Sequence, residues 1–154
     1  MKSVTIHRAG QNETATVARF VHALLDELTA GAPPSLQDVT ARAGSVLAGP
    51  GVIALIASVD AKPVGVMTLN ECAAIYAGGR FGEISELYIR PDMRSQGIAK
   101  RLLDHAQAEG IARGWHRIEV GAPGQPEWHR TLAFYRCNGF TEVGPRLRRL
   151  LQDQ

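Results

Sequence analysis

The sequence predicts one α/β domain in which a mixed, mostly antiparallel sheet carries helices on both faces. Apolar residues recur at helical spacing near the N-terminus, and β-branched apolar runs separated by tight turns fill the middle. Helix and strand patterns then alternate toward the C-terminus. The chain has 154 residues, 45% of them hydrophobic, which suits one packed core. We therefore expect a single domain over residues 1–154, with a central sheet of six or seven strands.

The composition argues against several classes of function. The formal net charge is only +2, which gives little support to a nucleic-acid partner. The longest uninterrupted apolar run, residues 52–57, is far shorter than the roughly 18–20 residues of a transmembrane helix. No secretion signal is visible, and Cys72 and Cys137 have no metal-ligand spacing. We expect a cytoplasmic protein with reduced thiols, no metal site and no membrane partner.

The N-terminal half is expected to contain a strand, two helices and three further strands. Residues 3–7 alternate in polarity, and apolar residues recur at helical spacing from residue 14 to residue 28. Gly31 and the prolines after it end this helix, and Ser35 suits the N-cap of a second helix that extends to about residue 47. The antiparallel strands are expected at residues 52–59, 64–69 and 83–89, with turns at 60–62 and 78–79.

The C-terminal half is expected to alternate between helices and strands. One apolar face predicts a helix from about residue 98 to Gly114, against whose end Trp115 packs. A loop with two prolines precedes a helix that opens at Glu127 and ends at Asn138 and Gly139, with Phe140 placed for the apolar contact of a C-cap. The expected strands are residues 116–120, 140–143 and 146–151.

The segment from residue 87 to residue 103 carries the clearest chemical signal. A strand leads through a short polar loop to Gly97, where a helix begins, and the first turn of a helix offers unpaired N–H groups to an anion. Gly97 has no Cβ to obstruct an anion, and Arg94, Lys100 and Arg101 add positive charge. The loop matches neither GxxxxGK[ST] nor GxGxxG. A phosphate or pyrophosphate site is one interpretation, and an ordinary helix cap is the other.

Two motifs connect this loop to a known family. Residues 94–99 read R-x-x-G-x-A, which resembles the acetyl-CoA motif (Q/R)-x-x-G-x-(G/A) of the GNAT superfamily of N-acetyltransferases. Residues 135–140 read Y-x-x-x-G-F, which is similar to the late helix of that family. The expected order of elements is also the GNAT order, so the resemblance covers nearly the whole chain. It implies a sheet that splays between its fourth and fifth strands.

The resemblance implies acetyl-CoA as the co-substrate. Backbone amides of the loop would hold the pyrophosphate, and the pantetheine arm would pair with the fourth strand like an additional strand. The implied cofactor-binding residues are Leu87, Tyr88, Ile89, Arg94, Ser95, Gln96, Gly97, Ile98, Ala99, Lys100, Trp128 and Tyr135. Trp128 departs from the family pattern, which often has an asparagine there, so an acyl group larger than acetyl stays open.

Three residues are candidates for the catalytic chemistry that the resemblance implies. Tyr135 stands where relatives often have the general acid that protonates the leaving CoA thiolate, although an aromatic packed beneath the cofactor is the alternative. Glu83 and Glu86 are candidate bases for the amine, and a solvated or ion-paired carboxylate is the alternative for each. Their spacing puts them on opposite faces of the sheet unless a bulge intervenes.

The resemblance therefore predicts an N-acetyltransferase that transfers the acetyl group of acetyl-CoA to a primary amine of a small molecule or peptide by direct attack in a ternary complex. The alternative is a catalytically silent acyl-CoA-binding sensor or scaffold. The acceptor pocket would be lined by about residues 25–39, which carry Asp26, Glu27 and Asp38. Relatives are often homodimers, and the sequence leaves both that state and the acceptor open.

Overall fold

The computed structural model describes residues 3–125 and 127–152, and the chain divides into two compact units between Val120 and Gly121. The first unit is built on one sheet whose strands follow the order of the chain, β1-β2-β3-β4-β5. Its strands are β1 (Val4–Arg8), β2 (Val52–Val59), β3 (Lys62–Ala74), β4 (Gly79–Ile89) and β5 (Ile118–Val120). The first four pair antiparallel, and β5 pairs parallel with β4.

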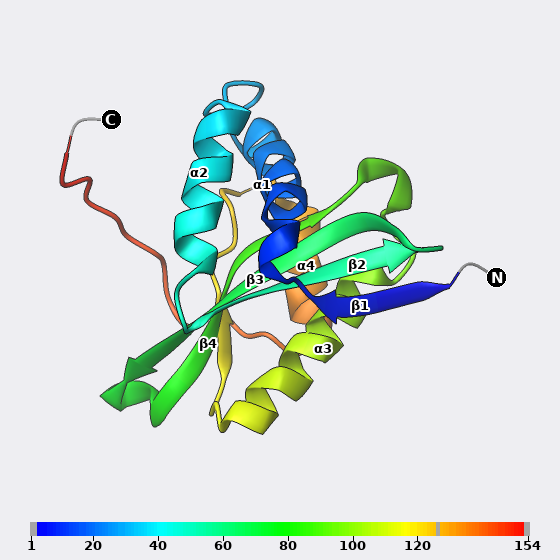
Figure 1. Cartoon of the computed structure of the whole chain (residues 1–154). Coiled ribbons are helices and arrows are strands. Elements are labelled where there is room, and N and C mark those ends of the chain that lie inside the picture. The colour runs from blue at the N-terminus through cyan, green and yellow to red at the C-terminus, as the bar shows by residue number, and fades with distance from the viewer. Residues whose placement is uncertain (1–2, 126, 153–154) are drawn as a thin grey trace. The chain divides into compact units, whose positions relative to one another are not determined.

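Helices cover both faces of this sheet (Figure 1). They are α1 (Thr14–Leu28), α2 (Leu36–Leu47) and α3 (Ile98–Arg113). On the α1 side, Val17 and Leu24 pack in one buried cluster with Ala54, Val66 and Tyr88 from the three central strands. The expected α/β architecture is confirmed for this unit.

Local signals placed the N-cap of α2 and the turn between β2 and β3 correctly, whereas β3 and β4 are longer and β5 is shorter than expected. The Ser35 hydroxyl accepts a hydrogen bond of 3.1 Å from the Asp38 amide, as an N-cap should. The turn between β2 and β3 consists of Asp60 and Ala61, both left-handed with φ of 49° and 69°. Left-handed values at both positions are those of a type I′ hairpin, formed here without glycine.

A β-bulge interrupts the pairing of β3 with β4. Thr68 lies opposite Glu86, and the next residue of β3, Leu69, lies opposite Ile84, so Ser85 is the extra residue on β4. An extra residue reverses the alternation of side chains beyond it. Glu83 and Glu86, opposite Asn70 and Thr68, therefore lie on the same face of the sheet, the one that α1 and α2 cover.

The pairing of β4 with β5 is short. It joins Gly82–Ile84 to Ile118–Val120 and stops there, although β4 continues to Ile89. Among the described residues, no strand pairs with the remainder of β4 on that side. The pairing ends because β5 itself ends at Val120, so the predicted splay between the fourth and fifth strands stays a prediction.

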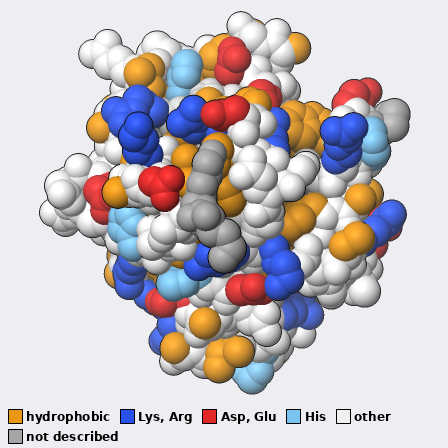
Figure 2. Space-filling view, turned by 90° about the vertical axis from the view of Figure 1, so that its right-hand side faces the viewer, with side chains coloured by type: hydrophobic (Ala, Val, Ile, Leu, Met, Phe, Trp, Pro, Cys, Tyr) orange, Lys and Arg blue, Asp and Glu red, His pale blue; other side chains and the backbone are white. Residues whose placement is uncertain are grey.

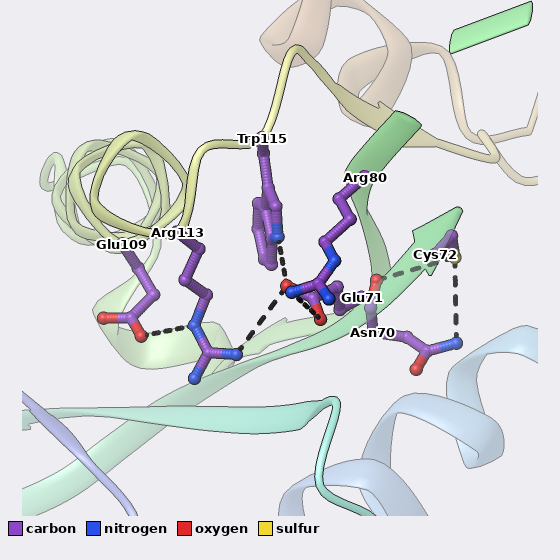
Figure 3. Close-up of polar contacts among 7 residues, drawn as sticks. All are labelled: Asn70, Glu71, Cys72, Arg80, Glu109, Arg113 and Trp115. Atoms are coloured by element: carbon purple, nitrogen blue, oxygen red, sulfur yellow. Dashed lines mark hydrogen bonds and ion pairs between the residues drawn. The ribbon is translucent and has the colours of Figure 1, made fainter. Parts of the chain in front are cut away.

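On the α3 side, Trp115 packs closely against two glycines. A Cβ on Gly110 would lie 2.7 Å from the Trp115 ring, and Gly82 of β4 is approached more closely still. Figure 3 shows Glu71 of β3 at the centre of the polar group beside this ring, accepting a hydrogen bond of 2.7 Å from Trp115 Nε1. Arg113 lies 4.0 Å and Arg80 3.9 Å from the same carboxylate. The expected packing of Trp115 against the end of α3 is confirmed.

Gly110→Ala is expected to lower the free energy of unfolding by about 1–3 kcal/mol, because the new methyl group overlaps the buried Trp115 ring. Gly44→Ala is the matched control. Gly44 also lies within a helix, α2, but a Cβ there meets nothing within 4 Å, so the better helix propensity of alanine should stabilise the protein by about 0.5–1 kcal/mol. Chemical denaturation of both variants measures the difference, and equal shifts would contradict the packing argument.

The second unit contains one helix, α4 (His129–Cys137), in its described part. Gly139 is left-handed with φ of 90°, and the Phe140 amide donates a 3.0 Å hydrogen bond to the Tyr135 carbonyl, so the expected C-cap is confirmed. The helix begins two residues later than Glu127, and one of the two expected loop prolines, Pro126, lies outside the described residues.

The expected strands at residues 140–143 and 146–151 do not form. The sheet has five strands in the described chain, so the expectation of six or seven is wrong. Gly144 has φ of 134° and Pro145 carries no amide hydrogen, which breaks the segment in two. Val143 and Leu147 are 79% and 92% exposed, so their apolar alternation buries no surface that would stabilise a strand.

Candidate functional site

The loop between β4 and α3 presents backbone N–H groups at the start of a long helix. A 3-10 turn, Pro91–Met93, follows β4, and buried Met93 anchors it. Ser95 and Gly97 are both left-handed, with φ of 62° and 80°. A Cβ on Gly97 would meet nothing within 4 Å, so the positive φ, not crowding, favours glycine there. The conformation turns the chain so that α3 opens with its unpaired N–H groups directly after the loop.

Most polar side chains of the loop form contacts within the protein, so they are less available to a ligand than the backbone N–H groups are. Arg90 pairs with Asp92, and Lys100 pairs with Asp104 one helical turn along α3. Gln96 Nε2 donates to the Asp92 carbonyl at 3.3 Å. Arg94 pairs with Glu27, so within the described residues Arg101 is the one basic side chain of this segment (Arg90, Arg94, Lys100 and Arg101) that forms no ion pair. An anion at this helix start would therefore bind mainly to main-chain N–H groups of Gly97, Ile98, Ala99 and Lys100.

Arg94, the first residue of the loop motif, points back into the first unit. Its Nε donates to the Ile89 carbonyl at 2.8 Å, and its Nη2 lies 2.9 Å from both carboxylate oxygens of Glu27 on α1. Its guanidinium carbon lies over the Tyr88 ring, 5.4 Å from the centroid. Burial, and secondarily the Glu27 charge, raise the pKa of the Tyr88 phenol. Arg94 thus connects the loop, the end of β4 and helix α1.

The end of β4 combines a buried core with an unpaired edge. Tyr88 is buried in the cluster beneath α1, whereas Leu87 and Ile89 lie on the other face, opposite Met67 and Gly65. Past Ile84, the N–H and C=O groups on the β5 side of β4 have no strand partner in the described chain. Such an edge can accept an extended ligand that forms strand-like hydrogen bonds.

The two candidate bases, Glu83 and Glu86, lie on the sheet face beneath α1 and α2, and only Ile84 and the bulged residue Ser85 separate them along β4. The Thr68 hydroxyl donates to Glu86 Oε1 and accepts a 3.0 Å hydrogen bond from the Glu86 amide. Glu83 lies opposite Asn70 on one side and opposite Glu119 of β5 on the other. Regular alternation would have put the two glutamates on opposite faces of the sheet. The bulge at Ser85 brings them to the same face.

The same acidic surroundings act on Cys72. Burial of this thiol raises its pKa, and the charges of Glu83, Glu119 and Glu71 raise it further. A thiol whose thiolate is disfavoured is a poor nucleophile. Cys72 and Cys137 are both free cysteines, as expected.

In the second unit, Tyr135 is buried at 4% exposure, and its ring makes edge contacts with Phe134 and Phe140, each with centroids 5.2 Å apart. Burial raises the pKa of its phenol well above the ordinary value. The residue therefore keeps its proton throughout the neutral and mildly basic range. Trp128 is the N-cap residue of α4, with φ of −106°, and its side chain forms no capping hydrogen bond.

Sequence reasoning missed three contributors to this region. Ser85 is the extra residue of the bulge, and Thr68 holds the Glu86 carboxylate. Glu27 was noted only as an acid that could attract a cation, not as the partner of Arg94. The arginine of the motif, for which the sequence offered no nearby partner, was the one signal that pointed to an acid such as Glu27. No sequence signal pointed to the bulge, because a bulge depends on the register of two strands.

Three further observations concern metal ligands, membrane-spanning helices and surface charge. In the described residues, no group of three or more His, Cys, Asp or Glu side chains could hold a metal ion, and no helix has the length and apolar character needed to cross a membrane. On the face drawn in Figure 2, basic side chains are scattered and acidic ones lie among them. The charge pattern of that face is not the basic stripe of a nucleic-acid binder.

The fold and the loop motif define an acetyltransferase of the GNAT class. Residues 18–140 match the sequence profile of the acetyltransferase (GNAT) family, and the chain belongs to this family. No curated protein sequence matches the chain significantly. The family assignment thus confirms the resemblance that the two motifs predicted.

Solved structures with this fold have diverse names. The chain is similar to an aminoglycoside acetyltransferase, HMB0005, from an uncultured soil metagenomic sample (TM-score 0.79, 23% identity, covering 97% of this chain and 99% of that one). A ribosomal-protein-alanine N-acetyltransferase from Brucella melitensis biovar Abortus 2308 gives a TM-score of 0.74 at 24% identity, covering 96% and 99%. A transcriptional regulator from Bacillus halodurans C-125 gives 0.80 at 16%, covering 97% and 100%. At these identities the likeness concerns the fold alone.

Proposed function

We propose that residues 1–154 form one acetyltransferase domain that transfers the acetyl group of acetyl-CoA to a primary amine. The left-handed pair Ser95 and Gly97 at the start of α3 carries this proposal, because it leaves main-chain N–H groups open to a pyrophosphate. Family membership supports acetyl-CoA as the anionic ligand. Two free cysteines suit a reducing compartment, so we place the reaction in the cytoplasm.

The unpaired edge of β4 supports the position of the pantetheine arm. Strand-like hydrogen bonds to Leu87, Tyr88 and Ile89 would place the thioester beside the splay of the sheet. A main-chain N–H there would stabilise the oxyanion of the tetrahedral intermediate, a contribution of about 3–4 kcal/mol in hydrolases.

The proposed reaction is a direct transfer in a ternary complex. The amine nitrogen attacks the thioester carbonyl carbon, the C–N bond forms, and the C–S bond breaks. Glu83 takes the proton from the amine and passes it to solvent, while Tyr135 protonates the CoA thiolate and recovers its proton from solvent. The products are the N-acetylated amine and CoA with a free thiol, so no oxidant or metal is required.

Glu83→Gln is expected to lower kcat by about 10²-fold, the usual effect of removing a general base. Glu86→Gln is the matched comparison, and its kcat should fall less than about tenfold. The Thr68 hydroxyl already occupies Glu86, and a glutamine carbonyl can still accept that hydrogen bond. Steady-state rates at saturating acetyl-CoA distinguish the two. A larger fall in kcat for Glu86→Gln than for Glu83→Gln would assign the base to Glu86. An unchanged kcat in both variants would exclude both carboxylates as the general base.

A silent acyl-CoA-binding protein is the second candidate, and Trp128 favours it, because relatives often have a polar cofactor contact there. The deciding experiment measures thiol release with acetyl-CoA and a panel of amines that includes aminoglycosides, polyamines and alanine-terminated peptides. We expect release above the rate of hydrolysis with at least one amine. Tight acetyl-CoA binding without release across the panel would favour the silent protein, and absence of binding would overturn both candidates.

A further inference from the structure

We propose that Glu27 and Arg94 form a positioning pair that holds the cofactor loop against helix α1, with Arg94 acting as a brace instead of a phosphate ligand. This inference rests on the proposed function of the loop and goes beyond it. It assigns a role to Glu27, a residue 67 positions away in the chain that no loop motif includes.

The contacts of Arg94 define a fixed geometry. Its Nε donates to the Ile89 carbonyl at 2.8 Å, so the side chain is tied to the last residue of β4. Its Nη2 lies 2.9 Å from each oxygen of the Glu27 carboxylate, near the C-terminal end of α1. The two contacts use different nitrogens of one rigid, planar group, which only arginine provides.

The surroundings of the pair favour this arrangement. The guanidinium covers the buried Tyr88 ring at 5.4 Å, and Tyr88 packs against Phe20 of α1 with ring centroids 6.0 Å apart. The side chains of Arg94 and Glu27 are 42% and 32% exposed, so water screens their attraction and the direct stabilisation is small. The effect of the pair should therefore appear in the geometry of the loop more than in global stability.

The consequence concerns the residue directly after the brace. Ser95 is left-handed without being glycine, a conformation that costs about 1–2 kcal/mol and needs support from its surroundings. Arg94, held on both sides, supplies that support and keeps Ser95, Gln96 and Gly97 in the anion-binding conformation. Glu27 also belongs to the helix that is expected to line the acceptor pocket, so the pair connects the two substrate sites.

Glu27→Gln distinguishes a brace from a phosphate ligand, because the two roles of Arg94 predict opposite changes in acetyl-CoA affinity. If Arg94 is a brace, losing the carboxylate charge loosens the loop, and calorimetry should show acetyl-CoA binding about fivefold weaker. If Arg94 is a phosphate ligand, the same change releases its charge toward the cofactor, and binding should strengthen or stay equal. Asp26→Asn is the matched control, because it removes the same charge from the exposed neighbour of Glu27 on α1.

Arg94→Lys completes the test. Lysine keeps the charge but lacks the planar fork, so it should weaken acetyl-CoA binding about as much as Glu27→Gln. The double variant should be no weaker than either single one, because both remove the same interaction. We expect the KM for acetyl-CoA to rise with little change in kcat or in the melting temperature, since a merely structural role would lower the melting temperature instead.

The outcomes are distinguishable from failure of the proposed function. Wild-type protein that binds no acetyl-CoA would overturn the proposed function and this inference together. Wild-type binding that Glu27→Gln leaves unchanged or strengthens, or an equal loss in Asp26→Asn, would overturn the brace alone. Additive effects in the double variant would also overturn it.

Discussion

Tyr135→Phe is expected to lower kcat by about 10²–10⁴-fold while acetyl-CoA affinity changes less than about twofold. The phenol of Tyr135 is our proposed proton donor to the departing thiolate. Because burial raises its pKa, the group is fully protonated at every pH of an ordinary assay. Phenylalanine keeps the edge contacts with Phe134 and Phe140, so the variant removes the hydroxyl and leaves the packing.

The measurement is a comparison of kcat with the dissociation constant of acetyl-CoA from calorimetry. Tyr76→Phe serves as the control, because Tyr76 is 72% exposed at the tip between β3 and β4. Since the raised pKa keeps the Tyr135 proton in place, any fall in kcat between pH 7 and 9 must come from another group. Unchanged turnover in Tyr135→Phe would remove the acid role and leave Tyr135 as a packed aromatic.

Gly97→Glu is expected to weaken acetyl-CoA binding by at least about 100-fold. Its carboxylate would occupy the start of α3, where the N–H groups and the helix dipole otherwise attract the pyrophosphate. The helix itself should survive, because a negative charge at an N-cap is favourable and a Cβ at this position meets no atom within 4 Å.

Gly97→Gln is the matched control for this variant. It has the same shape and the same cost of a positive φ, about 1–2 kcal/mol, but no charge. We expect Gln to weaken binding far less than Glu, with the difference growing smaller at high salt. Equal affinity of the two variants, measured by calorimetry, would place the pyrophosphate elsewhere.

The order of the elements in the first unit and the family to which the loop motif belongs were readable in the sequence, because both depend on short-range patterns. Helical spacing predicted α1 and α3, Ser35 predicted a cap, and the R-x-x-G-x-A motif led to the family that the sequence profile confirms. These features involve residues within a few positions of one another, so their geometry follows from local propensity and backbone sterics.

The same local reasoning failed where a pattern needed a distant partner. Residues 140–143 and 146–151 alternate as strands do, yet they form none, because a strand is stable only when another strand accepts its hydrogen bonds. Alternation describes which face a strand would bury, and it cannot say whether a partner is present.

Contacts between distant segments determine where the charged side chains of the candidate site lie. The common face of Glu83 and Glu86 results from the register of β3 against β4, where one extra residue at Ser85 reverses the alternation. The ion pair between Glu27 and Arg94 forms because α1 packs across the end of β4. Short-range pattern thus accounts for the elements and the cofactor motif of this protein. The direction in which its charged side chains point depends on contacts between segments far apart in the chain, whose register no local pattern encodes.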